Sequence, residues 1–542
     1  MCNRIYETEY LVFTIIVPII CRPHRTKRRI MPPSPNILIF CVDEMRADHL
    51  GCAGNPTVRT PNLDRLAARG MLFSRAYCAN PICMPARASM FTGMLPRDHG
   101  LRVNGQNLRR EVPTLPGTLA EAGYRTHAAG KLHLTAWVPK VEPPEPRRYP
   151  ECKDYWDRGV VREFPTPYYG FHSVDYVGGH TSWAYGDYGR WLRGQGGAPE
   201  QLLPDEPIGD APSSFRMRIP EKLHYNRYVA DSVIDLIEDS AGPDAPPFFA
   251  WCSFPDPHMP VGSPEPYRDM YDPAEVELPV RREGELDDLP PVYRRVMRGE
   301  LRPNGVDSSG VTDADWREII AGTYGMITHL DAEVGRVLDA LERAGLAEDT
   351  VVAFISDHGD MMGDHGLLWK SFYTFQGCIR LPLIVSAPGC PDGRVSDALV
   401  SQIDLMPTIL DLCEVPTPGE EWREAETPYE RGSVVPLRPY PGHSWRPLLE
   451  GSTERLREEV VIENDDPTCG FQVRALVTDR HRLTIYPATP HGELFDLQAD
   501  PDELHNLWYQ ENHSDLRAAL TARLLDAYSR ATPLYPIPPW NA

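Results

Sequence analysis

The sequence lacks an excess of basic charge. Its 542 residues include 55 Lys and Arg against 77 Asp and Glu, which gives a formal net charge of −22 at pH 7. A chain this acidic is repelled by phosphate backbones and anionic lipid headgroups, so we expect neither nucleic acid nor a membrane as a partner. Against this background, a local cluster of Lys and Arg is informative, because it indicates a site for an anionic ligand.

Paired cysteine motifs are also missing. The 12 Cys residues include no Cys-x-x-Cys pair and no spacing typical of a zinc site. Several of them lie inside apolar runs, as Cys41, Cys252 and Cys413 do. This usage indicates buried free thiols in a reducing compartment rather than a disulfide framework.

No hydrophobic run is long enough to be a clear membrane span. The apolar run at residues 11–21 is shorter than the roughly 20 residues that a transmembrane helix needs. Acidic residues precede this run and the basic residues of 22–29 follow it, which is the reverse of a secretion signal. We therefore expect residues 1–30 to lie outside the fold and the protein to be cytoplasmic. The alternative is a membrane-proximal anchor.

What is present is an alternation of apolar strands and amphipathic helices. Helical patterns at 225–240 and 315–344 separate continuous apolar runs of the kind found in buried parallel strands. This order predicts an α/β fold with a large mixed, mostly parallel central sheet sandwiched by helices. The predicted strands are 36–42, 124–129, 247–254, 350–355 and 381–386. We interpret residues 137–220 and 262–315 as long insertions over the active face that shape substrate choice.

The character of the chain changes after about residue 415. Short alternating strands at 459–463, 473–478 and 481–486 are typical of an antiparallel sheet, and a helical pattern follows to about residue 530. We therefore divide the chain into a catalytic domain at 31–415 and a smaller C-terminal α+β domain at 416–542.

Polar residues that can carry chemistry follow four of the predicted strands. In an open α/β sheet, ligands bind beyond the carboxyl ends of the strands. A single Asp at such an end can equally be a helix cap, but four such ends indicate one common site. The pairs are Asp43 and Glu44, Lys131 and His133, Asp256 and His258, and Asp357 and His358.

The most distinctive motif is Cys-Met-Pro-Ala-Arg at residues 83–87. Pro85 suits the first position of a helix, because its φ is fixed and it has no N–H, and Gly93 suits the end of that helix. Cys83 would then precede a helix N-terminus, where the dipole favours an anion, and Arg87 would reach the same anion from one turn further on. A lone Cys in such a turn is more often a buried thiol.

Cys-x-Pro-x-Arg followed by Ala-Ser-x-x-Thr-Gly resembles the signature of the type I sulfatases, and the resemblance covers most of residues 35–508. It implies an alkaline phosphatase-like fold. It also implies that Cys83 is oxidised by a formylglycine-generating enzyme to formylglycine, an aldehyde whose hydrate is the nucleophile. The further positions that match the family are Asp43, Gly130-Lys131-x-His133, His258, Asp357-His358, Lys370 and the Glu-Leu-Phe-Asp-Leu string at 493–497.

The resemblance implies one divalent metal ion. Carboxylate ligands suit Ca²⁺ or Mg²⁺, and one imidazole leaves Mn²⁺ open; Ca²⁺ is our preferred choice. Glu44 stands where the family usually has a second Asp, and the alternative for Glu44 is an ion pair with Arg46. The implied ligands are Asp43, Glu44, the modified Cys83, Asp357 and His358.

The resemblance also implies roles for the cations and imidazoles. Arg87, Lys131 and Lys370 supply positive charge where oxyanion charge builds. His258 is the acid that protonates the leaving alcohol, and His133 is the base that lets sulfate depart while the aldehyde reforms. Weaker candidates for the pocket wall are His99, Asn104 and His365, for which a local hydrogen bond is an equally good explanation.

We therefore expect hydrolysis of the sulfate ester of a small molecule or carbohydrate. The nearest alternative is a phosphonate monoester or phosphodiester hydrolase of the same superfamily, which Asp357-His358 suits. Gly130-Lys131-x-His133 favours the sulfatase. A catalytically inactive binding protein with the same fold is the third possibility, and the intact set of site residues argues against it.

Overall fold

The computed structural model describes residues 34–139, 141–207, 214–418 and 441–530. The expectation for residues 1–30 therefore concerns a segment outside the described residues. Among the helices within those ranges, none is both long enough and apolar enough to cross a membrane.

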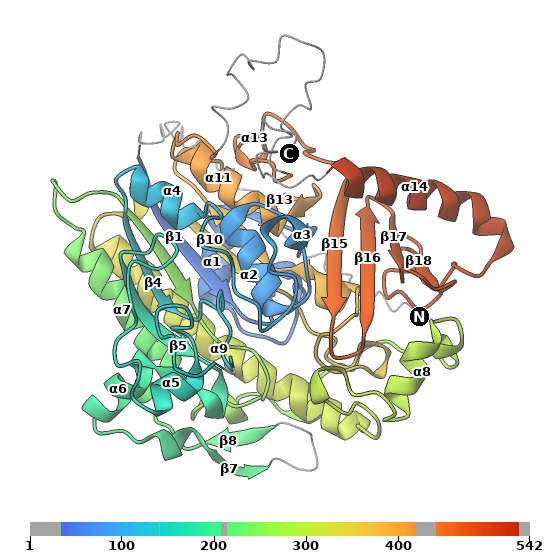
Figure 1. Cartoon of the computed structure of the whole chain (residues 1–542), viewed down its shortest axis with the longest axis horizontal. Coiled ribbons are helices and arrows are strands. Elements are labelled where there is room, and N and C mark those ends of the chain that lie inside the picture. Colours follow the sequence, from blue (N-terminus) through green and yellow to red (C-terminus); the bar gives the residue numbers. More distant parts are fainter. Residues whose placement is uncertain (1–33, 140, 208–213, 419–440, 531–542) are drawn as a thin grey trace, which may run out of the picture.

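A nine-stranded mixed sheet forms the centre of the larger part of the molecule (Figure 1). Strand β1 (Asn36–Val42) lies in the middle and pairs in parallel with β10 (Thr350–Ser356) and β9 (Phe248–Ser253). Strand β4 (Arg125–Gly130) continues the parallel set beyond β9, whereas β12 (Leu383–Ser386) runs antiparallel to β10. The predicted mixed, mostly parallel sheet is confirmed.

Helices cover both faces of this sheet. Successive side chains of β1 point to opposite faces, so residues 37, 39 and 41 belong to one hydrophobic core and residues 38, 40 and 42 to another. The helices of the first core are α2 (Cys83–Thr92), α4 (Leu115–Glu121) and α11 (Leu405–Leu412), and those of the second are α1 (Pro61–Ala68), α7 (Tyr225–Asp239) and α9 (Asp313–Arg343).

The edges of the sheet differ from the prediction. Strands β5 (Ser173–Gly178) and β6 (Tyr185–Gly186) extend it beyond β4, within the segment 137–220 that we interpreted as a long insertion over the active face. The residues of β5 are partly exposed and mixed in polarity, so no apolar run marks this strand. The two-residue strand β6 pairs only with the end of β5, so most of β5 has a neighbouring strand on one side alone. At the other edge lie β2 (Met71–Phe73) and β13 (Arg394–Ser396).

A smaller antiparallel sheet follows, in the order β15-β16-β17-β18, with helix α14 along it (Figure 1, right). Leu520 and Leu524 of the helix pack on Leu476, Leu483 and Leu494 of the strands. This arrangement confirms the predicted smaller C-terminal domain. The bounds are β15 (Glu459–Asp466), β16 (Phe471–Thr478), β17 (His481–Ile485), β18 (Gly492–Asp496) and α14 (Ser514–Arg530).

Short elements complete the described part of the chain. The helices are α3 (Pro96–His99), α5 (Lys153–Asp157), α6 (Asp187–Gly194), α8 (Pro291–Met297), α10 (Gln376–Ile379) and α13 (Arg446–Leu449), and the strands are β3 (Ala76–Tyr77), β7 (Pro204–Pro207), β8 (Phe215–Met217), β11 (Arg380–Leu381) and β14 (Val400–Ser401).

Candidate active site

The carboxyl ends of four parallel strands meet at one edge of the sheet, because β4, β9, β1 and β10 are neighbours. The polar residues that follow these strands in the sequence are therefore brought together, as we predicted. They are Asp43 and Glu44 after β1, Lys131 and His133 after β4, His258 after β9, and Asp357 and His358 after β10. The remaining predicted residue, Asp256, is held instead by the Tyr225 hydroxyl and Asn226 Nδ2.

Helix α2 brings the distinctive Cys to the same place. We had expected Pro85 to be the first residue of this helix. The helix begins at Cys83 itself, so Pro85 is its third residue. Gly93 ends the helix in a left-handed conformation with φ 66°, as predicted. The Cys83 Sγ lies 3.1 Å from His358 Nε2 and 3.6 Å from Asp43 Oδ1.

Four of the predicted metal ligands form a compact buried cluster. One ligand atom from each of Asp43, Cys83, Asp357 and His358 lies within 4.8 Å of the others. Burial and the neighbouring Asp43 carboxylate raise the pKa of Asp357, because two negative charges face each other away from water. A cation between them relieves this repulsion, so the residues present fit a divalent metal ion.

Glu44 lies at the side of this cluster. Its Oε2 is 2.7 Å from Lys370 Nζ and 2.9 Å from His258 Nε2, while Oε1 has no hydrogen-bond partner among the described residues. The alternative ion pair with Arg46 does not form within the described part of the chain, because Arg46 is held by Asp48 and Asp364, each at 2.7 Å. The buried Asp360 carboxyl also lies beside Glu44, and burial and the Glu44 charge raise the pKa of Asp360 well above its usual value.

Arg87 is fully buried and connects three strand ends. Its Nε donates to Asp357 Oδ2 at 2.8 Å, and its Nη1 donates to the Lys131 carbonyl at 2.9 Å and to Ser253 Oγ at 2.8 Å. The Lys131 ammonium in turn forms an ion pair with Asp43. Both cations therefore hold the carboxylates of the cluster in place.

The positive charges around the cluster act on the Cys83 thiol. Burial alone would raise the pKa of Cys83, but the charges of Lys131, Lys370 and His358 outweigh burial and hold that pKa well below its usual value. An anionic group is therefore stabilised at this position.

The two candidate proton-transfer residues are in opposite charge states. Burial and Lys370 act against protonation of His258, but the carboxylates of Glu44 and Asp43, together with a hydrogen bond to Cys83, outweigh them and raise the pKa of His258 to about 9. Burial and the Lys131 charge lower the pKa of His133 to about 3. His133 stacks on Trp137 with ring centroids 4.0 Å apart. At neutral pH, His258 holds a proton and His133 does not.

Two residues of the site were missed from the sequence. His180 stacks on His258 with centroids 3.7 Å apart, and the Glu151 carboxylate accepts the backbone N–H of His133 at 2.6 Å. His180 follows the end of β5, so the rule that predicted the other strand-end residues would have found it had that strand been recognised. Glu151 lies in an irregular segment and carries no comparable signal.

The weaker candidates lie in three different settings. Asn104 is next to the cluster, since its Oδ1 accepts the N–H of Met84 at 3.2 Å. His99 makes a local hydrogen bond, with Nε2 3.1 Å from Ser89 Oγ. His365 stacks on Phe375 with centroids 4.0 Å apart, away from Cys83.

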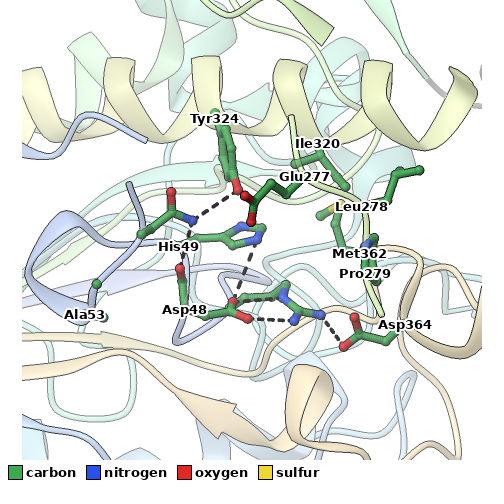
Figure 2. Close-up of a pocket in the computed structure, with 13 residues that line it drawn as sticks. Asp48, His49, Ala53, Glu277, Leu278, Pro279, Ile320, Tyr324, Met362 and Asp364 are labelled. Carbon is green, nitrogen blue, oxygen red and sulfur yellow. Dashed lines mark hydrogen bonds and ion pairs between the residues drawn. The ribbon is translucent and has the colours of Figure 1, made fainter. Parts of the chain in front are cut away.

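Two cavities of about 300 and 360 Å³ lie beside the site, and both are lined by Arg46, Asp48 and Asp364. Figure 2 shows the first of them, where the Tyr324 ring lies edge-on to His49 and its hydroxyl accepts from Asn55 Nδ2 at 3.1 Å. Among the described residues that line the two cavities, none belongs to the ten predicted catalytic and metal-binding residues, and His365 lines the second. These cavities are therefore separate from the Cys83 cluster.

The fold and the buried cluster define a hydrolase of the alkaline phosphatase-like superfamily. The family model described as Sulfatase matches residues 35–415, which is more than half of the chain, and the model described as N-sulphoglucosamine sulphohydrolase, C-terminal, matches residues 363–530. The chain belongs to the sulfatase family.

Known relatives agree with this assignment. The chain is 30% identical over 504 residues to an arylsulfatase of Clostridium perfringens, covering 89% of this chain and 92% of the relative. It is 28% identical over 555 residues to iduronate 2-sulfatase of Mus musculus, covering 90% and 93%. The crystal structure of the phosphonate monoester hydrolase of Agrobacterium radiobacter superposes with a TM-score of 0.74 at 25% identity, covering 92% of this chain and 96% of that one.

Proposed function

We propose that this enzyme hydrolyses the sulfate ester of a small organic molecule or carbohydrate, releasing an alcohol and inorganic sulfate. The observation that carries the proposal is the position of Lys131, whose ammonium pairs with Asp43 beside Cys83. The Gly-Lys-x-His motif that favours a sulfatase is thereby part of the buried cluster. We further propose that a formylglycine-generating enzyme converts Cys83 to formylglycine, which supplies an oxygen nucleophile once hydrated.

A divalent cation belongs at the same cluster. The residues that would hold it are Asp43, Asp357, His358 and the modified Cys83, with Glu44 Oε1 as a further ligand. Bound there, the ion would supply positive charge to the anionic ester and acidify the nucleophilic hydroxyl. The oxygen-rich ligand set favours Ca²⁺, with Mg²⁺ or Mn²⁺ as alternatives.

The cationic side chains bind and orient the sulfate group. Lys131 and Lys370 carry the charges that act most strongly on the thiol, so they are placed to hold the non-bridging oxygens as negative charge builds on them. Arg87 acts on the ester from one step further away, because its Nε holds Asp357. This network is fully buried, which strengthens each interaction relative to water.

Proton transfer falls to the two imidazoles. His258 is protonated at neutral pH because of Glu44, so it serves as the acid for the leaving oxygen. Its Nδ1 donates to the Met259 carbonyl, which leaves Nε2 on the side of Glu44 and Lys370. His133 is neutral and therefore available as the proton acceptor when sulfate departs.

A phosphonate monoester hydrolase is the second candidate, because the Agrobacterium radiobacter enzyme shares the fold at 25% identity. The test compares the sulfate, phosphonate and phosphate diester derivatives of one phenol on fully matured protein. We expect the highest kcat/KM for the sulfate. A phosphonate turned over much faster than the sulfate would overturn the proposal in favour of the second candidate.

A further inference from the structure

A second group of buried imidazole and carboxylate side chains lies between α9 and the turn before α7. His329 and Glu333 are four residues apart on α9 and so lie on the same face of that helix. Glu221, in the 3-10 turn Glu221–Leu223, approaches the same face. One ligand atom from each of the three lies within 4.8 Å of the others.

These side chains are poorly satisfied by their surroundings. His329 has no solvent exposure, and neither of its ring nitrogens has a hydrogen-bond partner among the described residues. Glu333 is equally buried; Arg336 holds its Oε2 at 2.5 Å, and its Oε1 is without a partner in the described chain. A buried polar atom without a partner destabilises the fold, so three in one place indicate a ligand.

We propose that Glu221, His329 and Glu333 bind a divalent transition-metal ion of the zinc class, separate from the cation at the Cys83 cluster. Zinc binds both imidazole nitrogen and carboxylate oxygen, and a water would complete a tetrahedron around these three ligands. With an imidazole among only three protein ligands, this site offers fewer oxygens than the six to eight that Ca²⁺ takes. Burial keeps His329 neutral, since it lowers the pKa of that ring to about 3, and a neutral imidazole is the metal-binding form.

Two neighbouring side chains are excluded as ligands by their own hydrogen bonds. The His224 Nδ1 accepts the N–H of Asn226 at 3.2 Å, which places the ring proton on Nε2. Both oxygens of Asp256 are occupied, one by the Tyr225 hydroxyl and the other by Asn226 Nδ2. The His224 Nε2–H has no partner among the described residues and is suited to hold the water on the metal.

The ion would link α9 to the 3-10 turn Glu221–Leu223, which precedes α7. The first two residues of α7, Tyr225 and Asn226, hold the Asp256 side chain, and the Asp256 carbonyl accepts the N–H of Asp43 at 3.3 Å. The proposed site therefore supports the strand end that carries His258. Its role is structural, and it does not depend on which ester the enzyme hydrolyses.

The test measures zinc directly. Protein equilibrated with ZnCl₂ and CaCl₂ is freed of unbound metal by gel filtration and analysed by inductively coupled plasma mass spectrometry. We expect His329→Gln to lose one zinc equivalent per chain relative to the wild type. Asp357→Asn, which alters only the Cys83 cluster, should retain that equivalent, and His505→Gln, an exposed control, should match the wild type. Unchanged zinc in His329→Gln, or zinc that is lost only in Asp357→Asn, would overturn the proposal.

Glu221→Gln is a second variant. Position 221 should tolerate substitution better than position 329, because Glu221 is only partly buried. We expect its zinc affinity to fall at least about tenfold. Zinc should also raise the Tm of the wild type more than that of Glu221→Gln, because a ligand that binds only the folded state stabilises it. Equal zinc affinities and equal Tm shifts in the two proteins would contradict the site.

Discussion

Arg87 Nε lies 2.8 Å from Asp357 Oδ2, and neither side chain has any solvent exposure. The same guanidinium also holds the Lys131 carbonyl and Ser253 Oγ. Because Arg87 is part of α2, this single side chain fixes the helix that begins with Cys83 to the ends of β10, β4 and β9. The signature Arg is therefore a structural group as well as a proposed functional one.

Replacing Arg87 should destabilise the fold as well as stop catalysis. Arg87→Met leaves the Asp357 carboxylate buried without its partner, and breaking a buried pair in this way costs about 3–5 kcal/mol. The matched control is Arg455→Met, because Arg455 pairs with Asp479 on the surface and 74% of its side chain is exposed. The free energy of unfolding of this variant should fall by less than about 1 kcal/mol. Urea unfolding measures the free energy of unfolding of both variants. Similar decreases in Arg87→Met and Arg455→Met would contradict the assigned role of Arg87.

Replacing Cys83 should stop catalysis while leaving the stability of the fold nearly unchanged. Cys83→Ala removes the precursor of the nucleophile and only one buried atom, so turnover should vanish while the free energy of unfolding changes by about 1 kcal/mol. Cys413→Ala, in a buried position of the same core as α2, should keep full turnover. Product release and urea unfolding test both variants. Loss of soluble protein in Cys83→Ala, or retained turnover, would contradict the proposal.

Removing the metal should abolish turnover, and added Ca²⁺ should restore it. If Glu44 Oε1 is a ligand, Glu44→Gln should weaken Ca²⁺ binding by about tenfold or more. Asp48→Asn is the control, since Asp48 is held by Arg46 outside the cluster. Calorimetric titration of the chelated protein gives each Kd. A Kd that is unchanged in Glu44→Gln would limit Glu44 to pairing with Lys370 and His258.

Activity should depend on pH through His258. Its pKa is raised from 6.5 to about 9, so the acid form is present at neutral pH and is lost as the pH rises through about 9. For the same reason, the stability that this proton confers is complete below pH 6.5 and is lost as the pH passes about 9. We expect kcat for an alkyl sulfate to fall as the pH rises through about 9. His258→Gln should lack this alkaline limb of the pH–rate profile. A nitrophenyl sulfate should show a weaker limb, because its leaving group needs little protonation. Identical limbs in wild type and variant would exclude His258 as the acid.

The strands at the centre of the sheet were predictable from the sequence because burial on both faces leaves a continuous apolar run. Strands β1, β9 and β10 all show it, and the residues that follow them were correctly placed together. Strand β5, near the edge of the sheet, has no such run, and His180 was missed with it. Lys370 lies in an irregular segment after β10, and only the family resemblance marked it.

Helix boundaries were less predictable than helices. Pro85 favours the first position of a helix, but Ile82 provides the extended residue before α2, so the helix starts two residues earlier. Glu44 was expected either to bind the metal, as the family resemblance implies, or to pair with Arg46, whereas its side-chain partners in the structure, Lys370 and His258, are remote in the chain. The domain boundary near residue 415 and the cytoplasmic location remain predictions.

The central claim is that the side chain at position 83 is the nucleophile only after oxidation to the aldehyde. The most direct measurement uses protein produced with graded amounts of a formylglycine-generating enzyme. Mass spectrometry of the peptide that contains residue 83 gives the converted fraction, and the initial rate of sulfate release is measured on the same samples. We predict a rate proportional to the converted fraction that extrapolates to zero for the unmodified thiol. A rate independent of that fraction would contradict the account.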